Sequence, residues 1–146
     1  MDDNLKEQFV HAIFRFRKSG MTLPAEFDIR ITELFLLRSI SANISHPNKS
    51  VHVSVIQNKL HITKPAVSQM LNSLEKRGYV KREMDKDDRR KIAVTLTSAG
   101  EEILKKAQEY FNLRLEATIS RFGVENTKQI THLFNLLADI NEDLKS

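Results

Sequence analysis

The chain has 146 residues, of which 40% are hydrophobic, and this length suits one domain with a modest core. Because it contains no cysteine, disulfides, zinc–thiolate sites and thiol redox sensing are excluded. Its net charge of +4 is concentrated in one segment: residues 59–91 carry ten Lys and Arg against five Asp and Glu, whereas the remainder carries 13 against 14. This imbalance predicts a polyanionic partner.

Neither a membrane span nor a secretion signal is expected. No apolar run approaches the roughly 20 residues that a membrane span needs. The first four residues, from Met1 to Asn4, are acidic rather than part of an apolar leader. We therefore expect a cytoplasmic protein with no membrane contact.

The first third of the chain predicts two helices. Apolar residues at three- and four-residue spacing indicate a helix over residues 5–18. A second helix is expected over 32–41, with Thr32 as its N-cap. Residues 43–48 are expected to form a loop, and residues 51–53 suit a short strand.

The middle of the chain predicts two helices separated by a tight turn. Ser54 is a candidate cap for a short helix over 55–60. Thr63 is the candidate N-cap of the next helix, whose first turn contains a proline that needs no intrahelical N–H. This helix reaches Arg77 and ends at Gly78, a residue suited to the left-handed position after a helix.

A β-hairpin and two long helices complete the predicted order. The two strands and the loop between them are expected at 79–84, 92–96 and 85–91. Thr97 or Ser98 caps the following helix, with Ser98 and Glu101 at the spacing of a capping box, and this helix reaches about Phe122. The last helix is expected over 125–144. These elements predict a mainly α fold, a winged helix-turn-helix lobe with a small β-hairpin wing plus N- and C-terminal helices.

The helix that starts at Lys64 has two chemically different faces. Its apolar residues follow helical spacing and form the expected core face, namely Val67, Met70, Leu71 and Leu74. The opposite face carries short or amide-bearing polar groups with cations at its ends, namely Lys64, Pro65, Ser68, Gln69, Asn72 and Lys76. Gln and Asn can pair bidentately with adenine, and Lys neutralises phosphate. Any exposed helix face is polar, but this one carries no carboxylate between Lys64 and Asn72, which favours a nucleic-acid groove.

The loop over residues 85–91 mixes carboxylates with cations. A solvated hairpin tip whose charges pair among themselves would also have this composition. A DNA-binding wing needs only one or two of the cations to project, and a narrow minor groove attracts such an Arg. Under this interpretation Arg90 is the inserted group and Asp88 orients it, while Arg89 and Lys91 contact phosphates.

Two segments resemble one known family. The run from Asp85 to Gly100, Asp-Lys-Asp-Asp-Arg-Arg-Lys-Ile-Ala-Val-Thr-Leu-Thr-Ser-Ala-Gly, is similar to the wing of the MarR family of bacterial regulators. In that family a D-x-x-D-x-R wing precedes a strand ending in Leu-Thr-x-x-Gly. The run from Lys64 to Val80 is similar to the family's recognition helix, and the helix order and chain length also fit.

The resemblance implies a homodimer held together by its first and last helices, about residues 4–20 and 101–146, around a DNA-binding lobe of about 32–100. It implies a transcriptional repressor that binds a pseudo-palindromic operator in double-stranded DNA. It also implies release when a small aromatic or phenolic effector enters a crevice between the dimer helices and the lobe, where Phe14, Phe16 or Phe35 are candidate lining residues. The expected DNA-binding residues are Thr63, Lys64, Pro65, Ser68, Gln69, Asn72, Lys76, Asp88, Arg89, Arg90 and Lys91.

Two alternatives concern the terminal helices and the class of function. The terminal helices carry more large apolar groups than a lobe of roughly 65 residues could bury, which favours a dimer over an intrachain three-helix bundle. A protein-interaction adaptor that keeps the winged-helix shape without reading DNA would have no reason to keep the wing cations. An enzyme is not indicated, because the sequence shows no nucleophile–base pair, Gly-rich phosphate loop or metal-ligand spacing among its five scattered histidines. We therefore expect no enzymatic activity, cofactor or metal.

Overall fold

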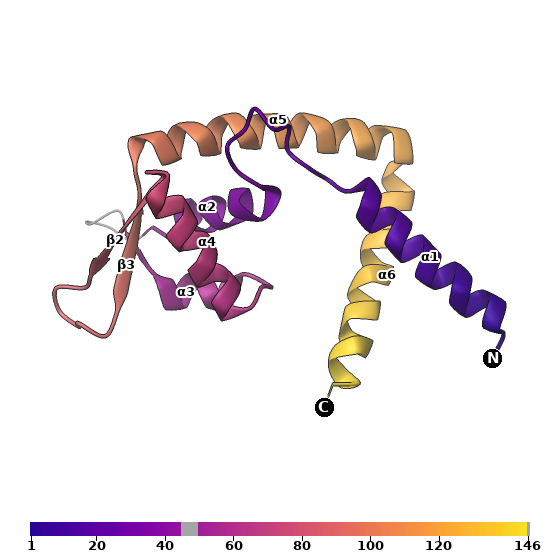
Figure 1. The fold of residues 1–146 in the computed structure, drawn as a ribbon. Helices are drawn as coiled ribbons and strands as arrows, with labels where there is room; N and C mark the ends of the chain where they lie inside the picture. The colour runs from indigo at the N-terminus through magenta and orange to yellow at the C-terminus, as the bar shows by residue number, and fades with distance from the viewer. Residues whose placement is uncertain (45–49, 146) are drawn as a thin grey trace. The chain divides into compact units, whose positions relative to one another are not determined.

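The computed structural model describes residues 1–44 and 50–145 (Figure 1). Its elements in chain order are α1 (Asp3–Ser19), α2 (Ile31–Ala42), β1 (Val51–His52), α3 (Val53–Lys59), α4 (Lys64–Lys76), β2 (Val80–Met84), β3 (Ile92–Leu96), α5 (Ser98–Phe122) and α6 (Val124–Asp143). The chain divides into two units, and the boundary lies within α5, after Ala107. The predicted mainly α, winged helix-turn-helix fold with N- and C-terminal helices is confirmed.

The predicted starts of α1, α2, α3 and α6 differ from the observed ones by one or two residues, and at α2 and α3 the predicted cap is wrong. Helix α2 begins at Ile31, so Thr32 lies inside its first turn and Arg30 occupies the N-cap position. The Glu33 carboxylate accepts the backbone N–H of Arg30 at 2.9 Å. Helix α3 begins at Val53 rather than at residue 55, so Ser54 is inside the helix and is not its cap. Of the predicted loop at 43–48, Asn43 caps the C-terminus of α2, and residues 45–48 lie outside the described residues.

The start of α5 resolves the choice between two caps. The Thr97 hydroxyl accepts the Gly100 backbone N–H at 3.0 Å and donates to the Gly78 carbonyl at 2.5 Å. Thr97 is therefore the cap, and the predicted capping box of Ser98 with Glu101 is wrong because Ser98 is already the first helical residue. The helix is thus tied to the turn that ends α4.

The winged lobe is assembled around a small antiparallel sheet. Its strand order is β1-β3-β2, with Val51 opposite Val94 and Val80 opposite Leu96. The core beneath it consists of buried aliphatic residues from α2, α3, α4 and the sheet, namely Leu34, Leu36, Leu37, Ile40, Ile56, Val67, Leu71, Leu74, Val80 and Val94. Burial of such side chains is the main stabilising term of a small lobe, at about 1.5–3 kcal/mol each.

Helix α4 is anchored to this core through one face. Val67, Leu71 and Leu74 are fully or almost fully buried, as predicted, whereas Met70 is only half-buried. Gly78 follows the helix with φ 78°, which confirms the predicted left-handed position. The face opposite the core is consequently held in a defined orientation.

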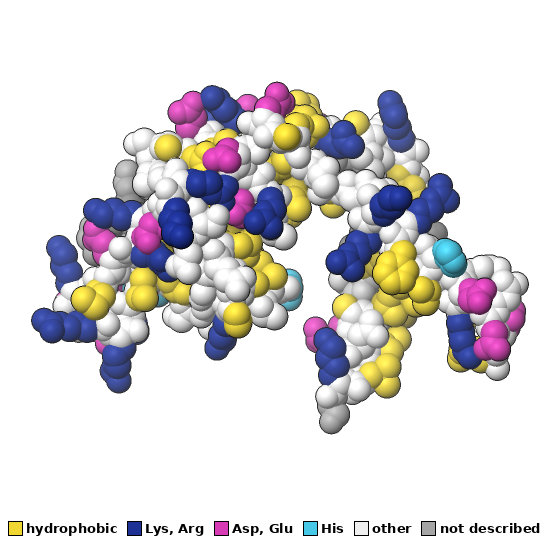
Figure 2. Space-filling model, viewed as in Figure 1, with side chains coloured by type: hydrophobic (Ala, Val, Ile, Leu, Met, Phe, Trp, Pro, Cys, Tyr) yellow, Lys and Arg dark blue, Asp and Glu magenta, His cyan; other side chains and the backbone are white. Residues whose placement is uncertain are grey.

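The terminal helices are different, since they expose apolar groups. In the part of the chain that the structure describes, α1 and α6 bury none of their own residues. Large apolar side chains are exposed along both, including Leu5, Phe9, Ile13, Phe16, Leu133, Phe134, Leu136 and Ile140. Figure 2 shows such side chains running along α6. None of the described helices has the combination of length and apolar composition needed to cross a membrane.

Candidate nucleic-acid interface

The N-terminus of α4 is built as the sequence predicted. The Thr63 hydroxyl accepts the Ala66 backbone N–H at 3.3 Å, and Pro65 occupies the first turn. Because the remaining N-terminal N–H groups have no intrahelical acceptor, this end of the helix attracts anions such as phosphate.

The predicted reading face of α4 is displayed on the surface. Lys64, Pro65, Gln69, Asn72 and Lys76 are exposed, and Ser68 is half-buried. These residues come to one side because Val67, Leu71 and Leu74 occupy the other. The structure therefore brings the helical part of the predicted set together on one side of one helix.

One contact on this face was not predicted from the sequence. Arg82 of β2 donates through Nη2 to the Asn72 amide oxygen at 2.6 Å and to Glu75 Oε1 at 2.9 Å. The hydrogen bonds from Arg82 lower the pKa of Glu75, so its carboxylate stays charged. Period-two alternation could have indicated Arg82, because it shares a strand face with the buried Val80, and that face packs toward α4.

The wing loop is organised by Asp85. Its Oδ1 accepts the backbone N–H groups of Asp87 at 2.8 Å and Asp88 at 3.1 Å, and its Oδ2 lies 2.7 Å from His52 Nε2. These contacts, with His52 first and the two backbone N–H groups after it, lower the pKa of Asp85 to about 2. This role of His52 could not be predicted from the sequence, because its partner is 33 residues away along the chain.

The wing cations project from this ordered tip. Asp88 Oδ1 accepts both the backbone N–H of Arg90 at 3.1 Å and its side-chain Nε at 3.2 Å, so the predicted Asp88–Arg90 contact is present. The Arg90 side chain nevertheless remains 92% exposed, and Arg89 and Lys91 are exposed as well. Figure 2 shows Lys and Arg side chains standing out from the β2–β3 wing.

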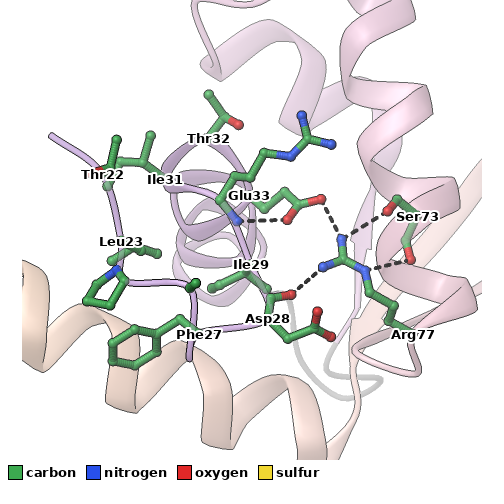
Figure 3. Close-up of a pocket in the computed structure, with 13 residues that line it drawn as sticks. Thr22, Leu23, Phe27, Asp28, Ile29, Ile31, Thr32, Glu33, Ser73 and Arg77 are labelled. Carbon is green, nitrogen blue, oxygen red and sulfur yellow. Dashed lines mark hydrogen bonds and ion pairs between the residues drawn. The ribbon is translucent and has the colours of Figure 1, made fainter. Parts of the chain in front are cut away.

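A cavity of about 700 Å³ is lined mostly by residues between 22 and 33, together with Ser73 of α4 and Arg77, the residue that follows this helix (Figure 3). Arg77 donates to the backbone carbonyl of Asp28, to Ser73 Oγ at 2.9 Å and to the buried carboxylate of Glu33 at 2.5 Å. The three phenylalanines expected to line an effector pocket, Phe14, Phe16 and Phe35, are not among its lining residues. The cavity thus adjoins the residue that ends α4.

Comparison with known proteins gives consistent matches. Residues 29–92 match the sequence model of the MarR family. The chain is 27% identical over 116 residues to YvnA, an uncharacterized HTH-type transcriptional regulator of Bacillus subtilis, with 75% of this chain and 68% of that protein covered. It is 29% identical over 99 residues to the HTH-type transcriptional regulator FarR of Neisseria gonorrhoeae, with 68% of each covered.

The fold is also shared with solved structures. Streptococcus pneumoniae FabT in complex with DNA aligns over 98% of this chain and 99% of its own, with a TM-score of 0.63 and 24% sequence identity. At that identity the likeness concerns the fold alone. The matched segment 29–92 contains the α4 face and most of the wing loop, so this part of the chain is similar to the MarR family of winged-helix transcriptional regulators.

Proposed function

We propose that this protein is a sequence-specific DNA-binding transcriptional regulator that acts as a repressor. The observation that carries the proposal is the pairing of two surfaces on one lobe: the amide- and cation-bearing face of α4, and an exposed Arg90 held by Asp88 at the wing tip. Relatives named as transcriptional regulators, and a fold shared with a DNA complex, support it. We also propose a cytoplasmic location and no enzymatic activity.

The residues divide into two roles. Ser68, Gln69 and Asn72 point from the middle of α4 and are suited to base edges in the major groove, whereas Lys64 and Lys76 at its ends are suited to phosphates. In the wing, Arg90 is suited to a narrow minor groove, because part of its rotamer freedom is already lost to the Asp88 contact. Thr63 and Pro65 shape the helix start, and Arg89 and Lys91 complete the phosphate contacts.

A homodimer is part of the proposal. A single recognition helix spans too few base pairs for useful specificity, whereas a two-fold pair reads half-sites about one DNA turn, roughly 34 Å, apart. The apolar side chains exposed on α1 and α6 are the surfaces we assign to the contact between the two copies. The operator is accordingly expected to be pseudo-palindromic.

The wing is tested by Arg90→Ala in a mobility-shift assay on the DNA upstream of the protein's own gene. Losing one hydrogen-bonding cation should weaken binding by about 1.5–3 kcal/mol, roughly tenfold or more. The slope of log affinity against log salt concentration should also become shallower by about one, because one fewer counterion is released. Since Arg90 is almost fully exposed, helix content and thermal stability should stay unchanged.

Lys106→Ala is the matched control, since it also removes one exposed cation, but from α5. Unchanged operator affinity in Arg90→Ala would remove the wing from the mechanism. If the unaltered protein retards no duplex even at low salt, the adaptor alternative replaces the regulator.

A small aromatic or phenolic effector completes the proposal. The cavity beside Arg77 falls within the roughly 300–1,000 Å³ typical of small-molecule sites. A ligand that drew Arg77 away from Glu33 would disturb the end of α4. Salicylate added to the protein–operator complex is therefore expected to release the duplex; retention of the duplex, with unchanged resonances around Arg77, would exclude this phenolic acid as the effector.

A further inference from the structure

Asn72 lies on the exposed face of α4, and its amide is held in one orientation. Arg82 Nη2 donates to Asn72 Oδ1 at 2.6 Å, a short charge-assisted hydrogen bond. Arg82 is itself held by Glu75, whose Oε2 accepts the Arg82 backbone N–H at 2.9 Å and whose Oε1 accepts Nη2 at 2.9 Å. The guanidinium therefore cannot move aside without giving up its ion pair.

This arrangement determines which amide atom faces outward. If the Asn72 amide turned over, its NH2 group would meet the guanidinium, and two donors would face each other without an acceptor. The carbonyl must consequently stay on the Arg82 side, and the NH2 group is left on the side away from it. Guanidinium groups do not lose their proton, so the preference holds at every physiological pH.

We propose that Arg82 is a positioning residue that makes Asn72 a donor-only reader of DNA, so that Asn72 selects guanine or thymine rather than adenine. The inference rests on the proposed function and makes it more specific. Adenine recognition by an amide needs a donor to N7 and an acceptor for the N6 amino group at the same time. With Oδ1 turned to Arg82 and the NH2 group turned outward, the two-bond pairing with adenine is lost and only adenine N7 can accept, beside the N6 amino group, which repels a second donor. Guanine instead offers two acceptors, N7 and O6, and thymine offers O4. The adenine pairing expected from the sequence then remains open only to Gln69.

The test begins with selection of bound duplexes from a random-sequence library by the full-length protein. Comparison with Asn72→Ala identifies the base pair whose identity depends on Asn72. We expect guanine or thymine there in the unaltered protein. Arg82→Met should free the amide and raise the affinity for adenine relative to guanine at this position by roughly fivefold or more, the value of about one hydrogen bond.

Lys81→Met is the matched control. It removes the neighbouring cation of the same strand, which pairs with Glu83 and does not contact Asn72, so total affinity should fall while the base preference stays. Asn72→Asp is a second variant that keeps the shape and an acceptor for Arg82 but removes the donor. It should abolish the preference for guanine or thymine even if Arg82→Met folds poorly.

The outcomes separate the inference from the function beneath it. A preference for adenine at the position that depends on Asn72, or a base preference unchanged in Arg82→Met, overturns the inference and leaves the regulator intact. Selection that enriches no sequence at all overturns the proposed function and the inference with it.

Discussion

At the wing tip, the Asp85 carboxylate gathers two backbone N–H groups and the His52 ring. The turn is therefore sensitive to acid, because protonation of this carboxylate would weaken these contacts. The loop then continues to Asp88, which accepts two hydrogen bonds from Arg90 and leaves its guanidinium exposed. These hydrogen bonds fix the conformation of the tip. That fixed conformation, rather than the number of charges, allows a single arginine to be presented to a groove.

The acid titration of the wing follows from the pKa of Asp85. Because that pKa is lowered from 3.8 to about 2, the contribution of Asp85 to the wing is fully present above about pH 4 and is lost as the pH falls through about 2. The backbone amide resonances of Asp87 and Asp88 should therefore shift with a midpoint near 2, and Asp85→Asn should remove that transition. The core amide of Leu71 reports any global unfolding. A midpoint near 4 with the core intact would contradict the role assigned to His52 and the backbone N–H groups.

Between elements, the turn that joins the wing to α5 depends on close backbone approach. The Thr97 hydroxyl donates a hydrogen bond to the Gly78 carbonyl, and the backbone N–H of Thr97 donates to the Tyr79 carbonyl at 3.1 Å. A Cβ on Gly100 would lie 2.0 Å from that same carbonyl oxygen. The Leu-Thr-x-x-Gly pattern therefore has a structural basis: the threonine caps the helix, and the glycine lets its first turn pack on the strand.

Gly100→Ala tests this packing against helix propensity. Propensity alone predicts that Ala stabilises a helix by about 1 kcal/mol relative to Gly. The clash with Tyr79 backbone predicts the opposite, a loss of about 1–3 kcal/mol in the free energy of unfolding. Urea denaturation decides between them, with Ser98→Ala at an exposed neighbouring position as the control. A stabilised Gly100→Ala variant would show that α5 shifts freely from the strand.

At the scale of the whole molecule, the exposed apolar faces of α1 and α6 need a partner. A contiguous apolar surface of this kind on a water-exposed helix marks an interaction site. In our proposal that partner is a second copy, and the dimer sets the distance between two α4 helices. DNA affinity should then depend on residues that never touch DNA.

Phe9→Glu on α1 tests the dimer. A carboxylate placed on the apolar face would have to be buried without a counter-charge, which costs several kcal/mol, so we expect a monomer by sedimentation velocity. Operator retardation should be lost, while the circular dichroism of the winged lobe remains. Gln8→Glu adds the same charge to the neighbouring exposed position and should stay dimeric. Persistence of the dimer in Phe9→Glu would locate the interface elsewhere.

The sequence by itself determined the features that depend on neighbouring residues. The helical spacing of Val67, Leu71 and Leu74 was enough to predict which side of α4 is exposed, and the short separation of Asp88 and Arg90 was enough to predict their contact. These interactions span a few residues, so periodicity and turn chemistry decide them. The binding roles of the face and the wing residues stay predictions.

Only the tertiary structure decided how distant segments meet. Arg82 reaches Asn72 because β2 packs against α4, and His52 reaches Asp85 because β1 pairs with β3. The same is true of the starts of α2 and α3, where Thr32 and Ser54 are reasonable caps by residue type but not by position. Local propensity allows several helix boundaries and side-chain partners of similar energy. The packing of the hairpin against the helices determines which of them form.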